Sequence, residues 1–328
     1  MPKWKYLILI ILIAGLILSG YTLSEMLSFQ ESTQRIVQIN NGDSARTIGM
    51  KLKQTGIISS QNAFRTLAKL RRADKNLKPG TYIFGGRTNL WQTVSRLQDG
   101  ISQNIRITFP EGLSLYKTLM RIDASGLADY QALYSAATDT TLVRQLTGLP
   151  LNSLEGFLYP ETYLFPVTSS PDSILSIMTH EFFRRLDRQG LSIQNSDDFY
   201  KNLILASIVE KEAGNEEERA LIAGVFTNRM RIGMPLQSCP TVDYILEQRG
   251  IRREVLTNAD TSIPSAYNTY VNPGLPPTPI SNPRLESLIA AMQPAKHAYL
   301  YFFSNRQGKN VFSSSYEEHQ RLQRQMKL

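Results

Sequence analysis

A carboxylate that follows a long apolar segment is the feature of this sequence best suited to chemistry. Residues 203–209 are apolar apart from Ser207, and Glu210, Lys211 and Glu212 follow them directly. In a helix, the face of Glu210 carries only small or apolar side chains, namely Leu203, Ala206, Ser207 and Ala213. Burial there would favour the protonated form that a general acid needs and leave room for a ligand. The alternative is that residues 210–212 are the exposed polar end of a buried helix.

Two further segments combine aromatic rings with carboxylate or amide groups, a combination that suits sugar recognition. Aromatic rings pack on the C–H faces of pyranoses, while amides and carboxylates bind hydroxyl and N-acetyl groups. The first segment, residues 154–163, contains two glutamates that could bind sugar or tune Glu210, and the second spans residues 267–277. The candidate substrate-binding residues in them are Glu155, Tyr159, Glu161, Tyr267, Asn268 and Tyr270. The alternative role of the tyrosine-rich loop is packing at a domain junction.

The elements around Glu210 predict an αα-hairpin that would fix the orientation of this side chain. Gly214 can end the first helix, and Asn215 can cap the second. Glu218, at the third helical position, completes a start that resembles a capping box. The apolar run from Leu221 to Met230 predicts that the second helix packs on a core.

The first part of the chain predicts a small α+β unit. Alternation over residues 36–39 indicates a strand, and apolar spacing over residues 44–54 and 60–72 indicates two helices, with Ser44 as a candidate N-cap. A second strand is predicted over residues 81–84. This strand–helix–helix–strand order resembles a LysM-like module, a class that binds N-acetylated glycans. The alternative is a packing domain without a ligand.

The connecting part and the amino terminus complete the organisation. We expect helices over residues 90–98 and 114–122 and a strand over residues 105–109. Residues 6–24 carry no charge, approach the roughly 20 residues that cross a bilayer, and follow Lys3 and Lys5. This pattern predicts an uncleaved anchor with the rest of the chain outside the cytoplasm. A cleaved signal peptide is the alternative, although no clear A-x-A site follows the apolar run.

Composition narrows the classes of partner. The 328 residues carry a formal net charge of +8, which favours an anionic polymer or membrane surface. No basic stripe with interleaved aromatic residues is present, so a nucleic-acid partner is not expected. One cysteine excludes an intrachain disulfide, and three widely separated histidines give no zinc pattern. We therefore expect no metal and no cofactor.

Several segments, taken in order, make the sequence resemble the endolytic murein transglycosylase family, called MltG or YceG-like. The matching segments are residues 154–163, 205–213, 219–234, 236–238, 240–242, 266–270, 274–277, 294–296, 299–302 and 312–319. The resemblance implies an α+β fold class with a single N-terminal transmembrane helix, a small LysM-like domain and a C-terminal α+β catalytic domain. The expected boundaries are 1–24 for the cytoplasmic tip and anchor, 25–35 for a tether, 36–104 for the LysM-like domain, 105–150 for a connecting α+β segment and 151–328 for the catalytic domain.

The family resemblance also implies an activity. Its members are lyases (EC 4.2.2.-) that cleave the β-1,4 bond between N-acetylmuramic acid and N-acetylglucosamine and leave 1,6-anhydro ends, which here would terminate or trim nascent strands. The family's catalytic glutamate matches Glu210, and Gln237 and Thr241 are expected to line the cleft. The implied partners are peptidoglycan glycan strands, the inner (cytoplasmic) membrane and peptidoglycan synthases. A muramidase that hydrolyses the same bond and a non-enzymatic cell-wall-binding scaffold are the alternatives.

Four positions depart from the family's usual residues. Cys239 stands where an aspartate is usual, and Asn310 stands where a histidine is common. Thr278 and Arg284 replace usual glycines. None of these departures removes the proposed acid.

Overall fold

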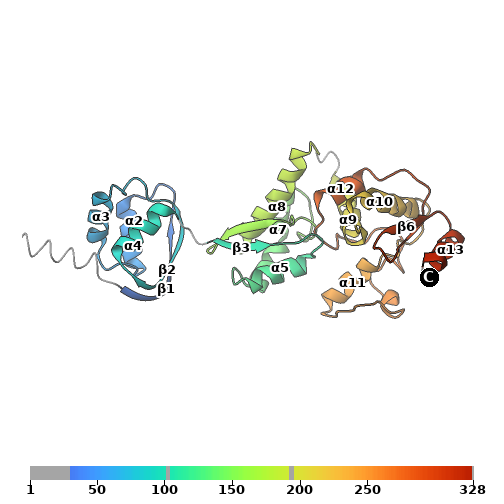
Figure 1. Ribbon diagram of the computed structural model, residues 1–328, viewed down its shortest axis with the longest axis horizontal. Helices are drawn as coiled ribbons and strands as arrows, with labels where there is room; N and C mark the ends of the chain where they lie inside the picture. Colours follow the sequence, from blue (N-terminus) through green and yellow to red (C-terminus); the bar gives the residue numbers. More distant parts are fainter. Residues whose placement is uncertain (1–29, 101–103, 192–195, 327–328) are drawn as a thin grey trace, which may run out of the picture. The chain divides into compact units, whose positions relative to one another are not determined.

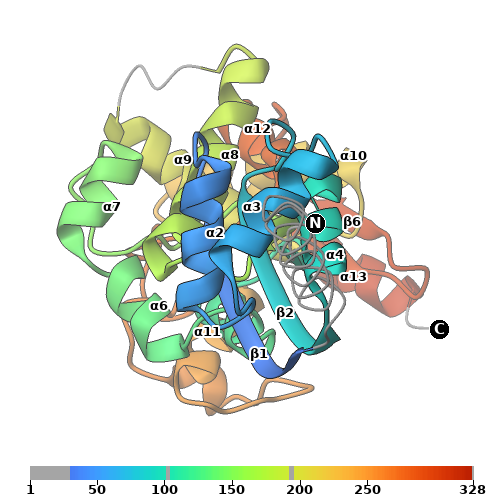
Figure 2. The ribbon, with the colours of Figure 1, turned by 90° about the vertical axis from the view of Figure 1, so that its left-hand side faces the viewer.

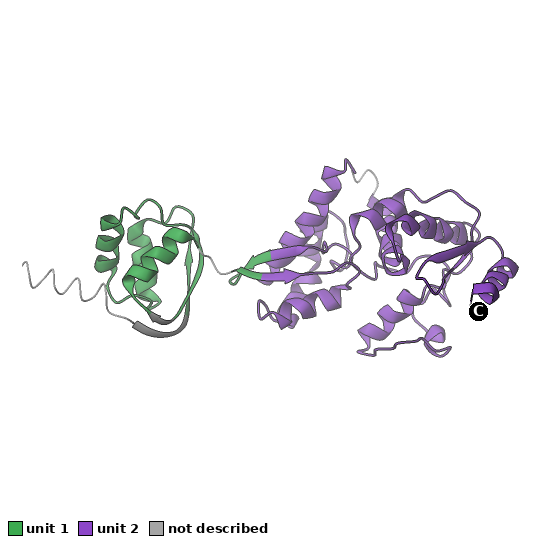
Figure 3. Cartoon of the chain, viewed as in Figure 1, with its two compact units in different colours: residues 1–105, 164–168 green, residues 106–163, 169–328 purple. Residues whose placement is uncertain are grey.

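The computed structural model describes residues 30–100, 104–191 and 196–326, and it divides into two compact units (Figure 3). Unit 1 comprises residues 1–105 with 164–168, and unit 2 comprises residues 106–163 with 169–328. The predicted anchor at residues 7–23 lies outside the described residues. Within the described ranges, no helix has the length and apolar character needed to cross a bilayer.

Unit 1 is built on two antiparallel strands with three helices packed against them (Figures 1 and 2). The elements in chain order are β1 (Gln30–Ile39), α2 (Ala45–Gln54), α3 (Gln61–Leu70), β2 (Gly80–Thr88) and α4 (Leu90–Asp99). The predicted order of strand, helix, helix and strand is confirmed. Ser44 and Ser60 accept hydrogen bonds from the first turns of α2 and α3, as N-cap residues do.

The core of unit 1 collects the apolar positions that these periodic patterns predict. Leu52, Phe64 and Phe84 are completely buried, and Tyr82 is nearly so. The Tyr82 hydroxyl donates to the Lys78 carbonyl over 2.7 Å, so this buried polar group is satisfied. Unit 1 is therefore an α+β domain with a core of its own.

The first part of unit 2 contains four helices that pack on one another and part of a two-stranded sheet, whose residues 104–105 and 164–166 belong to unit 1. Strand β3 (Asn104–Thr108) pairs with β4 (Thr162–Pro166). The helices are α5 (Leu115–Ala124), α6 (Tyr130–Ala137), α7 (Thr140–Thr147) and α8 (Pro171–Arg188). Most of the predicted connecting segment, from residue 106 to 150, thus belongs to the same compact unit as residues 169–328.

The second part of unit 2 is a helical core with a small antiparallel ribbon. Helices α9 (Ser196–Glu212), α10 (Glu216–Arg231) and α12 (Leu285–Met292) pack on one another (Figure 1). The remaining elements are α11 (Cys239–Gln248), the 3₁₀ turn η1 (Asp260–Ser262), β5 (Tyr301–Ser304), β6 (Asn310–Ser313) and α13 (Tyr316–Met326). Helix α9 is buried on nearly all sides after Leu203, which explains why its sequence is almost continuously apolar.

The predicted αα-hairpin of α9 and α10 is present. The Asn215 side chain accepts from the Glu218 amide over 3.1 Å and caps α10. The Glu218 side chain does not make the contact that the predicted capping box assigns to it. The Glu218 carboxylate instead accepts from the backbone and side-chain nitrogens of Asn310, at 2.9 and 2.7 Å. Asn310 therefore ties β6 to the start of α10.

Candidate active site

Glu210 lies in the last turn of α9 and is charge-paired. Its Oε2 accepts from the Arg284 amide at 3.0 Å and from the Ser287 hydroxyl at 2.7 Å. Its Oε1 accepts from Arg284 Nε at 3.1 Å and lies 3.6 Å from Arg219 Nη2. The side chain is only 3% exposed. The sequence predicted small or apolar neighbours on the helix itself, and the structure adds polar and charged partners from distant parts of the chain that contact both carboxylate oxygens.

The contacts of Glu210 with Arg284 stabilise the start of α12. Arg284 is the N-cap residue of α12 and provides no side-chain cap of its own. The Glu210 carboxylate accepts the Arg284 amide instead, and a negative charge is favourable at a helix N-terminus. Ser287 also accepts from Arg219 Nε at 2.9 Å, which closes the network with α10. Glu210 thus holds three helices together.

Glu212, two residues further along, has a different environment. It is about 200° around the helix from Glu210, is half-buried, and accepts a hydrogen bond of 2.6 Å from Ser238 Oγ. Burial raises the pKa of Glu212, and the Asp243 carboxylate adds to this effect, while the Ser238 hydrogen bond and Arg229 oppose it. A raised pKa favours the protonated form that a general acid needs. We therefore identify Glu212 as the second candidate acid, which the motif alone did not favour.

The chain positions Glu212 by tying two loops together. Gln237 is exposed, adopts a left-handed conformation with φ of 52°, and donates its amide to the Thr269 carbonyl at 3.0 Å. Cys239 Sγ lies 3.1 Å from the Tyr270 hydroxyl. Gln237, Cys239 and Tyr270 are thereby brought to the side of α9 on which Ser238 contacts Glu212.

Two residues that the sequence predicted to bind sugar are buried and make hydrogen bonds within these loops. Thr241 is completely buried, and its hydroxyl lies 2.9 Å from that of Thr269. Asn268 is also completely buried, and its amide donates to the carbonyls of Thr261 and Ile263 at 3.1 and 2.8 Å. These contacts are those of loop-stabilising residues.

Glu155 is buried away from solvent, with 3% exposure. It accepts from the Leu115 amide at 2.8 Å and from the Tyr244 hydroxyl at 3.1 Å. Burial raises the pKa of Glu155 to about 8, against the two hydrogen bonds, with a further contribution from Glu247. The Tyr244 ring packs on that of Tyr267, 5.1 Å between centroids. Glu155 therefore joins the start of α5 to α11 from within.

Tyr159 and Glu161 gather around Arg185 on the Glu210 side of unit 2. Arg185 forms an ion pair of 2.6 Å with Glu161, and its guanidinium lies 5.2 Å from the centre of the Tyr159 ring. All three line a polar cavity of about 450 Å³ to which Arg284 also contributes. They are separate from the cluster around Glu212.

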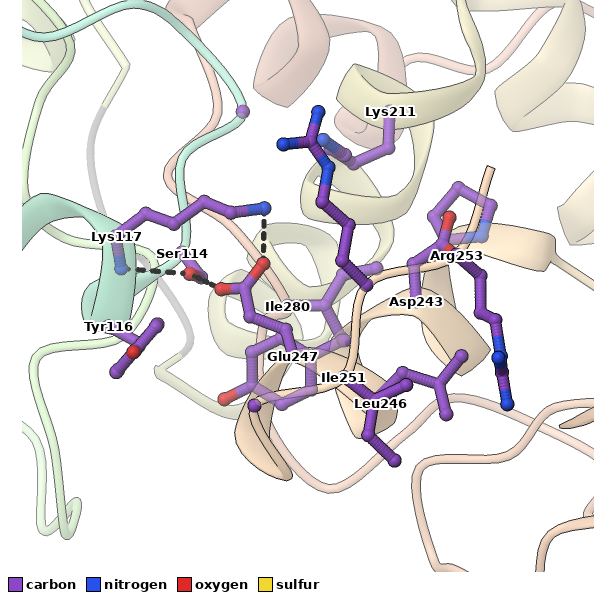
Figure 4. A pocket seen from close by; sticks show the side chains of 15 residues that line it. Ser114, Tyr116, Lys117, Lys211, Asp243, Leu246, Glu247, Ile251, Arg253 and Ile280 are labelled. Atoms are coloured by element: carbon purple, nitrogen blue, oxygen red, sulfur yellow. Dashed lines mark hydrogen bonds and ion pairs between the residues drawn. The ribbon is translucent and has the colours of Figure 1, made fainter. Parts of the chain in front are cut away.

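A larger cavity, of about 560 Å³, lies along α11 (Figure 4). Lys211 and Asp243 line it, and the Asp243 charge contributes to the raised pKa of Glu212, which is not itself among the lining residues. Gly112 also lines the cavity, and a Cβ at that position would lie 3.6 Å from the Glu210 Cγ. On its other side, Glu247 forms an ion pair with Lys117 and accepts a hydrogen bond from the Ser114 hydroxyl (Figure 4). The cavity thus provides binding space near the last turn of α9, which carries Glu210 and Glu212, as expected of an active site.

No group of three or more metal-ligating side chains is found in the ranges that the structure describes. The single cysteine, Cys239, is exposed to solvent. Partial burial of its thiol raises the pKa of this group.

The chain is similar to known proteins over most of its length. The model of the YceG-like family matches residues 37–325. An endolytic murein transglycosylase of Bacillus subtilis is 31% identical over 94% of this chain and 89% of its own length. A protein of the same name from Streptococcus pneumoniae is 27% identical over 92% of this chain, which spans 60% of that relative's length.

A solved structure is also similar. The crystal structure of a YceG-like protein from Listeria monocytogenes has 32% sequence identity and a TM-score of 0.57, and the match covers 88% of this chain and 98% of the other. The family model and the B. subtilis relative each extend over most of the chain. This chain belongs to the YceG-like family.

Proposed function

We propose that this chain is a lytic transglycosylase of peptidoglycan and therefore a lyase. The relatives named endolytic murein transglycosylase support this activity, because they match across both units. The single observation that carries the chemistry is a carboxyl with a burial-raised pKa, Glu212, in the same last turn of α9 as Lys211, which lines a cavity of about 560 Å³. The bond cleaved is the β-1,4 linkage between N-acetylmuramic acid and N-acetylglucosamine, and the product has a 1,6-anhydro end.

One carboxyl group suffices for this reaction. The acid protonates the departing glycosidic oxygen as the bond to the anomeric carbon breaks. The resulting carboxylate then takes the proton from the muramoyl 6-hydroxyl, whose oxygen attacks the same anomeric carbon and closes the anhydro ring. The attack is intramolecular, so proximity is supplied by the substrate. The acid recovers its proton and no water is consumed, whereas a hydrolase normally needs a second carboxylate.

We assign the proton transfers to Glu212 in preference to Glu210, the residue that the motif favours. Both oxygens of Glu210 are engaged by Arg284, Ser287 and Arg219. Contact with a glycosidic oxygen would require this network to open, and the start of α12 would lose its cap. Glu212 keeps one side-chain hydrogen bond, to Ser238, and its raised pKa favours the protonated form.

For the N-terminal segment and unit 1, the proposal is less specific. The apolar segment at residues 7–23 supports an anchor in the inner membrane, with the two units outside the cytoplasm. The strand–helix–helix–strand order supports a LysM-like, glycan-binding role for unit 1. Termination or trimming of nascent strands beside a peptidoglycan synthase would use this arrangement.

The experiment that tests the activity is mass spectrometry of strands released from sacculi by the purified protein. Anhydro-muramoyl ends are expected. Reducing muramic acid ends that incorporate ¹⁸O from labelled water would identify a muramidase instead, with Asp243 as its second carboxylate to examine. Intact glycan after prolonged incubation would identify a binding scaffold.

A further inference from the structure

The cavity along α11 carries more positive charge than the sugars of a glycan strand require. Two carboxylates and four cations line it, namely Asp243, Glu247, Lys117, Lys211, Arg252 and Arg253. N-acetylated sugars linked through amidated lactyl groups are uncharged, so hydroxyl and amide partners would be enough for them. The charge therefore points to another part of the substrate.

The ion pairs within the cavity leave two cations without a carboxylate partner. Lys117 is neutralised by Glu247, which also accepts from Ser114 (Figure 4). Arg253 lies 3.7 Å from Asp260. In the ranges covered by the structure, neither Lys211 nor Arg252 forms an ion pair within 4.0 Å. Asp243 is the carboxylate whose titration Lys211 influences, and burial opposes its ionisation by raising its pKa.

Apolar side chains form the remaining lining. They are Tyr116, Leu246, Ile251 and Ile280, with the ring of Tyr244 among them. A cavity with apolar walls and unneutralised cations fits a ligand that combines short alkyl groups with a carboxylate. In murein, this description applies to the peptide stem, whose alanine methyls and free carboxylates are attached to the muramoyl lactyl group.

We propose that this cavity binds the carboxylate-bearing peptide stem of the muramoyl residue at the scissile bond, with Arg252 and Lys211 as the groups that recognise the carboxylate. This inference rests on the proposed function. Lys211 lies in the last turn of α9, so a stem held here places its own muramoyl sugar near the carboxyl groups at the end of that helix. The enzyme then selects strands whose stems carry negative charge.

The test compares two substrates that differ only in charge. Uncrosslinked strands with intact stems are assayed beside the same strands whose carboxylates have been converted to amides, and release of anhydro ends gives kcat/KM. The wild-type protein is expected to cleave the charged strands about tenfold more efficiently than the amidated strands. This ratio is at the lower end of the effect of a hydrogen bond to a charged group, because Arg252 and Lys211 are exposed. In Arg252→Ala the ratio of the two rates should fall toward one, and in Arg252→Glu it should fall further. Arg249→Ala is the matched control, because this exposed arginine follows α11 without lining the cavity.

Each possible outcome either supports or overturns the proposed stem site. Loss of the preference in both Arg252 variants, with the preference kept in Arg249→Ala, supports the stem site. Equal cleavage of the two substrates by the wild-type protein overturns the stem site and leaves the transglycosylase activity intact. A preference that survives both Arg252 substitutions assigns the stem to another surface and also overturns it. Failure to cleave either substrate overturns the proposed function and this inference with it.

Discussion

Replacement of Glu155 by glutamine should change how the stability of unit 2 depends on pH. Glu155 is buried between α5 and α11, and its pKa is raised from 4.5 to about 8. The native state therefore holds this proton more tightly than the unfolded state does. The stability that the protonated group contributes is fully present below pH 4.5 and is lost as the pH rises toward 8.

The magnitude follows from the size of this shift. One pKa unit corresponds to about 1.36 kcal/mol, so the free energy of unfolding should fall by up to about 2.7 kcal/mol between pH 5.5 and pH 7.5 through this group alone. Glutamine can accept from the Leu115 amide and donate to the Tyr244 oxygen, so it retains both contacts without titrating. Glu155→Gln should therefore gain stability relative to the wild type as the pH rises.

Urea unfolding followed by far-UV circular dichroism, repeated across this pH range, measures the difference. Both tryptophans, Trp4 and Trp91, precede residue 106, so tryptophan fluorescence reports unit 1 and provides an internal control. The fluorescence transition should be the same in both proteins. Parallel pH dependences of the circular dichroism transition in wild type and Glu155→Gln would refute the reasoning.

Three further predictions concern the site and unit 1. Ser287→Ala removes the hydroxyl between Arg219 and Glu210 and should lower the free energy of unfolding by about 1–3 kcal/mol, measured by urea titration, while the products keep anhydro ends. Unchanged stability would show that the network is dispensable. Cys239→Ala and Cys239→Asp should both retain activity, because a free thiol is usually a packing group, and loss of activity in both folded variants would give the thiol a role. Deletion of residues 36–88 should weaken sedimentation with sacculi more than it alters the products, and a different chemical end would contradict this division of labour.

Local signals predicted most of the secondary structure. Ser44 and Asn215 were identifiable as caps because a cap depends on a few neighbouring residues, and both accept the expected amide. The Ser44 and Asn215 caps and the strand–helix–helix–strand order of unit 1 followed from spacing alone. The extension of α9 back to Ser196 was not predicted, because its first turns are polar.

The environment of the candidate acids could not be predicted from the sequence, since it depends on contacts between distant residues. Glu210 is 74 positions from Arg284, and Glu155 is 89 positions from Tyr244. Helical spacing correctly identified the residues that share the face of Glu210 on its own helix, but it could not indicate that Arg219 and Ser287 approach from α10 and α12. The same spacing places Glu212 about 200° from Glu210 and predicts a milder effect of Glu212→Gln, so it gave no signal for a role of Glu212 as the acid.

The matched pair Glu212→Gln and Glu210→Gln tests the central claim most directly. Glutamine keeps the size of each side chain but cannot transfer the proton, and an acid–base group typically contributes about 10²–10⁴-fold to rate. The measurement is the rate at which each variant, shown to be folded by circular dichroism, releases anhydro-muropeptides from sacculi. Because one residue performs both proton transfers, Glu212→Gln should lose at least about 10³-fold, while Glu210→Gln should retain measurable activity with lower stability. Near wild-type release by Glu212→Gln, with loss in a folded Glu210→Gln, would contradict the account and return the catalytic role to Glu210.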